Sequence, residues 1–80
     1  MEKEIPRQVI KEAGCLVEYY GENFRFLGER ENLEVYQFLF PEDIVTGFPF
    51  IYMYNPKNHT AYEITGFEAI DIIQELLAEE

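Results

Sequence analysis

The two side chains best suited to nucleophilic or acid–base chemistry are His59 and Cys15, each the only residue of its type in the chain. A catalytic histidine needs a nucleophile and a group that orients its ring. His59 stands in the turn-forming stretch "NPKNHT", where no such partner is visible, and this context predicts an exposed turn residue. Cys15 follows a predicted helix end, which favours a small buried residue over a reactive thiol. A lone cysteine also offers no pair of zinc ligands, so we predict no catalytic residue, metal or cofactor.

Acidic side chains form two groups that could bind cations or basic partners. Glu42 and Asp43 are adjacent, but calcium loops space several oxygen ligands around a glycine turn, so this pair indicates a turn or a helix start. The second group is a row along the last predicted helix, made of Glu68, Asp71, Glu75 and Glu79. Such a row is typical of a solvated helix face. The alternative is a mimic of DNA phosphates that inhibits a basic nucleic-acid-binding protein.

The overall charge narrows the range of partners. Sixteen acidic and six basic residues give a net charge of −10, and the basic residues are scattered singly. Binding to DNA, RNA or an anionic membrane depends on clustered Lys and Arg, so we expect no nucleic-acid or membrane partner. The start of the chain lacks the pattern of a signal peptide, and no apolar run approaches the roughly 20 residues of a membrane span. The expected compartment is the cytoplasm, and the expected partner is another protein or a second copy.

The 80 residues predict one small domain, residues 1–80, with a short helix at each end. Pro6 and Gly14 fit the two ends of a first helix over residues 6–13. Thr65 and Glu68 fit a capping box that starts the last helix. Between the helices, alternating or β-prone stretches predict five strands, at 15–20, 23–28, 33–40, 48–54 and 60–65. Short connections favour an antiparallel meander, so we predict an α+β fold of order α-β-β-β-β-β-α with both helices on one face of the sheet.

The stretch "TGFPFIYMY" (46–54) contains four aromatic residues and no charge. Alternation places aromatic side chains on one face of strands 33–40 and 48–54, and aliphatic side chains on the other. If the helices cover the aliphatic face, the aromatic face is a candidate interaction surface. If they cover the aromatic face, the rings are core. The candidate interaction residues are Tyr36, Phe38, Phe50, Tyr52 and Tyr54.

Residues 46–79 resemble the C-terminal half of thioredoxin-like domains. The shared features are a Gly-x-Pro element before a strand, then a turn, a second strand, a glycine and a final helix, and the matching positions are Gly47, Pro49 and Gly66. The resemblance implies a cis Pro49. The chain departs from the family because it has no Cys-x-x-Cys motif, and residues 15–40 leave no room for the family's first helix. The resemblance therefore implies at most a remnant without redox chemistry.

The pattern as a whole indicates a small non-enzymatic protein-interaction module. It would act through the aromatic sheet face or through a sheet edge, with a homodimer as one form. The acidic mimic is the alternative, and the thioredoxin-like remnant is third.

Overall fold

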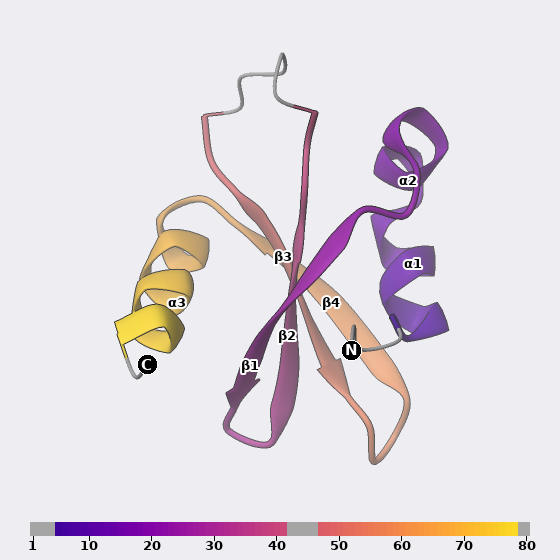
Figure 1. Cartoon of the computed structure of the whole chain (residues 1–80). Coiled ribbons are helices and arrows are strands. Elements are labelled where there is room, and N and C mark those ends of the chain that lie inside the picture. The colour runs from indigo at the N-terminus through magenta and orange to yellow at the C-terminus, as the bar shows by residue number, and fades with distance from the viewer. Residues whose placement is uncertain (1–4, 42–46, 79–80) are drawn as a thin grey trace.

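The computed structural model describes residues 5–41 and 47–78. The elements follow the chain as α1 (Arg7–Ala13), α2 (Cys15–Tyr20), β1 (Phe24–Arg30), β2 (Leu33–Phe38), β3 (Phe50–Asn55), β4 (Thr60–Thr65) and α3 (Phe67–Ala78). The four strands form one sheet in the order β1-β2-β3-β4, and every neighbouring pair is antiparallel (Figure 1). The predicted α+β class and antiparallel meander are confirmed, with four strands in place of five.

The missing strand is Cys15–Tyr20, which forms the short helix α2. Leu16, Val17 and Tyr20 are the residues of this segment that pack against the core, whereas Cys15 and Glu18 are exposed. Leu16 and Val17 are adjacent, and Tyr20 follows one helical turn later, so their spacing is that of a helix. In a strand, adjacent residues would point to opposite faces. The strand prediction relied on the β-prone composition of "CLVEYY", and it was wrong.

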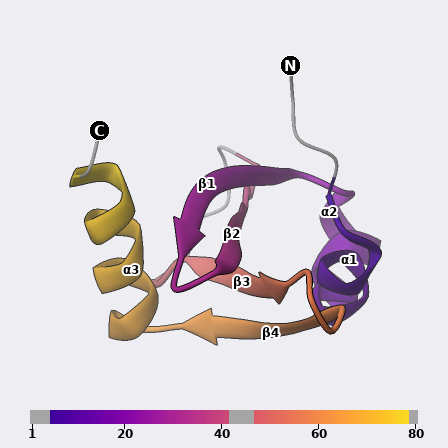
Figure 2. The same ribbon diagram turned by 90° about the horizontal axis from the view of Figure 1, so that it is seen from below.

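The helices lie on opposite faces of the sheet, which corrects the prediction that both cover one face. In Figures 1 and 2, the sheet separates α3 from α1 and α2. The helix α1 contacts β3 and β4, and α3 contacts the two edge strands β1 and β4. The register of β2 and β3 places aromatic residues opposite aromatic residues and aliphatic residues opposite aliphatic ones. Tyr36 pairs with Tyr52, and Val35 pairs with Met53. Each face is therefore apolar over neighbouring strands, and each needs its own cover.

Two hydrophobic clusters result, one on each face. The aliphatic cluster joins the sheet to α3 and consists of Leu27, Val35, Ile51, Met53, Ala69, Ile72 and Leu76. The aromatic cluster joins the sheet to α1, and its buried members are Val9, Ala13, Tyr36, Phe38, Tyr52 and Tyr54. Because α1 and α2 pack on one face of the sheet and α3 on the other, this small chain has two cores.

The hairpin turns follow from local residue chemistry. Glu31 and Asn32 connect β1 to β2 and both have positive φ, 53° and 68°, as a tight two-residue hairpin of the right twist requires. The β3–β4 turn begins at Asn55, whose side-chain oxygen accepts a hydrogen bond from the Lys57 backbone N–H at 2.9 Å. This local bond is the reason that asparagine is frequent at the start of a turn, and it fits the predicted role of "NPKN".

The start of α3 differs in detail from the predicted capping box. Thr65 remains in β4, and its hydroxyl donates to the backbone carbonyl of Pro49 at 3.0 Å. Gly66, with φ 79°, makes the turn, and the helix begins at Phe67. The Thr65 side chain therefore ties the end of β4 to the segment that leads into β3.

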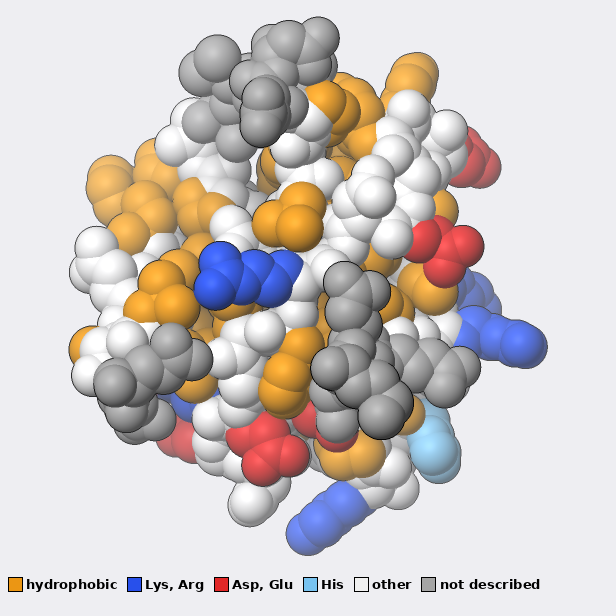
Figure 3. Space-filling view, in the orientation of Figure 1, with side chains coloured by type: hydrophobic (Ala, Val, Ile, Leu, Met, Phe, Trp, Pro, Cys, Tyr) orange, Lys and Arg blue, Asp and Glu red, His pale blue; other side chains and the backbone are white. Residues whose placement is uncertain are grey.

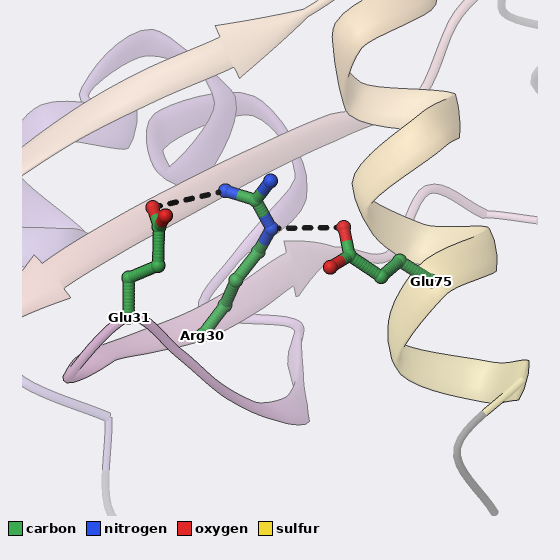
Figure 4. A network of polar contacts seen from close by, with 3 residues as sticks. All are labelled: Arg30, Glu31 and Glu75. Carbon is green, nitrogen blue, oxygen red and sulfur yellow. Dashed lines mark hydrogen bonds and ion pairs between the residues drawn. The ribbon is translucent and has the colours of Figure 1, made fainter.

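An ion pair fixes α3 to the hairpin between β1 and β2. The Nε of Arg30 donates to a carboxylate oxygen of Glu75 at 3.0 Å, and the Glu31 carboxylate lies 3.4 Å from the same guanidinium (Figure 4). The bond to Glu75 raises the pKa of Arg30. Both partners are solvent-accessible, so this contact orients α3 more than it stabilises the fold. Within the part of the chain that the structure describes, no helix is long and apolar enough to cross a membrane.

Candidate interaction surface

The five aromatic residues that the sequence nominated for binding lie on the face covered by α1. Tyr36, Phe38, Tyr52 and Tyr54 are buried, and Phe50 is half-buried against the same cluster. Phe38 packs edge to face against Phe40, with the centroids 5.0 Å apart, and Phe50 meets Phe40 at a tilted angle. The rings thus fill a core and do not form an exposed face.

The hydroxyl groups of the buried tyrosines reach polar partners at the border of this cluster. The Tyr36 hydroxyl donates to Glu34 at 2.7 Å, and the Tyr52 hydroxyl donates to Glu63 at 2.8 Å. Burial, followed by the bond to the neighbouring carboxylate, raises the pKa of both tyrosines, so both remain protonated donors at neutral pH. These bonds satisfy the hydroxyls and fix the position of two carboxylates.

The residues considered for chemistry are not gathered in a reactive site. Nδ1 of His59 lies 3.0 Å from the Tyr54 hydroxyl, at an exposed turn position with φ 56°, as predicted for a turn residue. Cys15 is exposed at the start of α2, so its predicted burial was wrong. Among residues 5–41 and 47–78, no three His, Cys, Asp or Glu side chains cluster as metal ligands would.

The acidic groups are only partly within the described residues. Glu42, Asp43 and Glu79 lie outside them. On α3, Glu68, Asp71 and Glu75 are exposed as predicted. Arg30 already pairs with Glu75, which interrupts the row that would imitate a string of phosphates.

The two edges of the sheet differ in how well they could accept another strand. The edge strand β1 is irregular, because its register with β2 shifts between Phe26 and Gly28, and Gly28 has φ 142°. It also carries three charged residues, Arg25, Glu29 and Arg30. Bulges and charges are the devices by which proteins prevent edge strands from pairing with other chains. The β1 edge is therefore protected.

The other edge strand, β4, has no bulge and only one charged residue. Its six residues pair with β3 in unbroken register from Thr60 to Thr65. The sequence "TAYEIT" contains no proline and one charged residue, Glu63, whose carboxylate is bound to the Tyr52 hydroxyl. In Figure 2, β4 lies along the lower border of the molecule, and no labelled helix or strand lies beyond it. A regular, β-prone and nearly uncharged edge can accept a further strand.

Exposed aromatic residues lie on β4 and at the point where it ends. Tyr62, in the middle of β4, is 48 % exposed, and Phe67, the first residue of α3, is 77 % exposed. The rings of Phe67 and Phe48 stack edge to face with their centroids 5.1 Å apart. Figure 3 shows hydrophobic side chains gathered at the upper left, where β4 leads into α3 in Figure 1. We call Thr60–Thr65 with Phe48 and Phe67 the β4 edge surface.

Comparisons with known proteins give no further guide to the function. No family model matches the sequence, and no significant match was found among curated proteins or solved structures. The cis Pro49 that the thioredoxin-like resemblance implied is wrong, because the described residues contain no cis peptide bond.

Two sequence signals could have directed attention to the β4 edge surface. Gly28, which ends the predicted strand "NFRFLG", lies inside β1. A glycine within a strand is a common sign of a bulge, and it distinguishes β1 from β4. The segment "TAYEIT" also contains one charged residue, whereas "FRFLGER" contains three. The ring contact between Phe48 and Phe67 could not be predicted from the sequence, because it depends on the register of β3 and β4.

Proposed function

We propose that this protein is a small non-enzymatic protein-interaction module that binds its partner by adding an extended strand to the open edge of β4. The observation that supports this proposal is the asymmetry between the edges: β1 is bulged and charged, whereas β4 is regular and carries one charge. Backbone N–H and C=O groups of an edge strand supply hydrogen bonds to an added strand, and alternate side chains provide specificity.

The exposed aromatic residues suit this binding mode. Tyr62 projects from the strand that would be paired, and Phe67 stands beyond its end. Aromatic cross-strand pairs stabilise a sheet by about 0.2–1 kcal/mol each, so Tyr62 would add to the backbone bonds. The aromatic cluster and the aliphatic cluster then serve as a rigid support that keeps β4 extended.

An array of synthetic ten-residue peptides with alternating polar and apolar residues tests this function. The fluorescently labelled chain is applied at nanomolar concentration, so that self-association is negligible. We expect a subset of peptides to bind, and Tyr62→Lys to weaken their binding by about tenfold or more, because a lysine on an edge strand opposes pairing. Tyr19→Lys is the matched control, since Tyr19 is 81 % exposed on α2 and the change in charge is identical.

Peptides that bind Tyr62→Lys as tightly as the wild type would place their binding site away from the β4 edge. An array without any binding peptide would also contradict the proposal. Circular dichroism of each variant establishes that the fold is retained, so that a loss of binding reports on the edge itself.

A further inference from the structure

We infer that a second copy of this chain can occupy the β4 edge, by antiparallel pairing of the two β4 strands centred on Tyr62. This inference rests on the proposed function and names its partner. A two-fold axis perpendicular to the sheet reverses the direction of the strand and keeps each face of the sheet on the same side. Two copies related in this way continue one sheet from four strands to eight, with aromatic face beside aromatic face.

The register of the pairing follows from side-chain parity. Residues opposite each other must point to the same face, so the axis must pass through a residue position. Only axes at Tyr62 or Glu63 keep most of the six-residue strand paired. An axis at Glu63 sets the two Glu63 side chains opposite each other, and like charges in that position are unfavourable. An axis at Tyr62 pairs the two tyrosines and sets Ala61 opposite Glu63, so this register is preferred.

The charge of the chain explains why this surface suits self-association. Each copy has a net charge of −10, so most contacts between copies would oppose carboxylates to carboxylates. The β4 strand brings one acidic residue per copy, and the Tyr52 hydroxyl already binds that carboxylate. A six-residue strand is about 20 Å long, which gives an interface at the small end of specific complexes. We therefore expect micromolar affinity that increases with salt, because salt screens the repulsion between the two anionic chains.

Sedimentation equilibrium across a concentration series measures the affinity of the dimer. We expect a monomer–dimer equilibrium for the wild type, a dissociation constant increased about tenfold or more in Tyr62→Lys, and a constant within about twofold of the wild type in Tyr19→Lys. Equal weakening by both substitutions would overturn the assignment to β4.

Cross-linking provides a readout that does not depend on affinity. In a Cys15→Ser background, Tyr62→Cys should form an intermolecular disulfide under mild oxidation, because Cα atoms directly opposite in antiparallel strands are about 4.5–5.5 Å apart. Thr60→Cys is the control, since its symmetry mate lies several residues away along the strand. Preferential cross-linking of Thr60→Cys would contradict the register.

The outcomes separate the two proposals. A chain that remains a monomer at millimolar concentration, while array peptides still bind in a Tyr62-dependent manner, excludes the homodimer and keeps the interaction function. A monomer that binds no peptide excludes both.

Discussion

Tyr52→Ala should reduce the free energy of unfolding by about 3–5 kcal/mol, the range for removing a large aromatic side chain from a core. Tyr52 is 0 % exposed and lies in the middle of β3, under α1. Its ring contacts Phe24 edge to face, with the centroids 6.0 Å apart. A small domain has a total stability of only about 5–15 kcal/mol, so this single truncation could leave the chain largely unfolded at room temperature. Urea denaturation followed by far-ultraviolet circular dichroism measures the change.

Two further variants make this prediction specific. Tyr19→Ala, the same substitution at an exposed position of α2, should change stability by no more than about 0.5 kcal/mol. Tyr52→Phe keeps the ring and removes the hydroxyl that donates to Glu63, so we expect a loss of about 0.5–1.5 kcal/mol. If Tyr52→Ala were tolerated as well as Tyr19→Ala, the aromatic face would not be a core, and it would again be a candidate binding surface.

Leu76→Ala should reduce the free energy of unfolding by about 2–5 kcal/mol. The substitution removes contacts in the aliphatic cluster, on the face of the sheet opposite to Tyr52. Leu76 is 6 % exposed and packs in the aliphatic cluster, with a methyl group close to Gly28 of β1. The adjacent Leu77 is 42 % exposed, so Leu77→Ala, the identical chemical change, should cost less than about 1 kcal/mol.

The pair Leu76 and Leu77 also tests the orientation of α3. Helical spacing of apolar residues in the sequence predicts a stripe that contains both leucines, made of Ala69, Ile70, Ile73, Leu76 and Leu77. The structure instead buries Ala69, Ile72 and Leu76. Equal reductions in the free energy of unfolding for Leu76→Ala and Leu77→Ala would indicate that α3 packs on the stripe predicted from apolar spacing. A larger loss of stability for Leu76→Ala would confirm the orientation of α3 in the structure.

Local sequence signals were reliable where a short pattern alone determines the structure. Pro6 and Gly14 bracket α1, and "TAYEIT" forms β4 with the predicted limits. The strand prediction for Cys15–Tyr20 was wrong because it was based on β-prone composition. The spacing of the residues that pack against the core is helical. The strand 33–40 ends two residues early, at Phe38.

The arrangement of the helices could not be predicted from the sequence, because it depends on strand register. Alternation shows that Tyr36 and Val35 face opposite ways, but it does not say which residues of β3 lie beside them. Once Tyr36 pairs with Tyr52 and Val35 pairs with Met53, both faces become apolar and each requires a helix. The expectation of a single covered face therefore failed at a long-range contact. Of the two alternatives left open for the aromatic rings, the structure shows the one in which they are core.

β4, and not β1, is the edge at which we propose that the chain associates with a second copy. Amide hydrogen exchange followed by mass spectrometry over a concentration series tests it most directly, because backbone bonds to an added strand slow exchange along the paired edge. We predict that the segment Thr60–Thr65 gains protection as concentration rises, while Phe24–Arg30 exchanges at a constant rate. Protection that grows in Phe24–Arg30, or exchange in Thr60–Thr65 that is the same at every concentration, would contradict the claim.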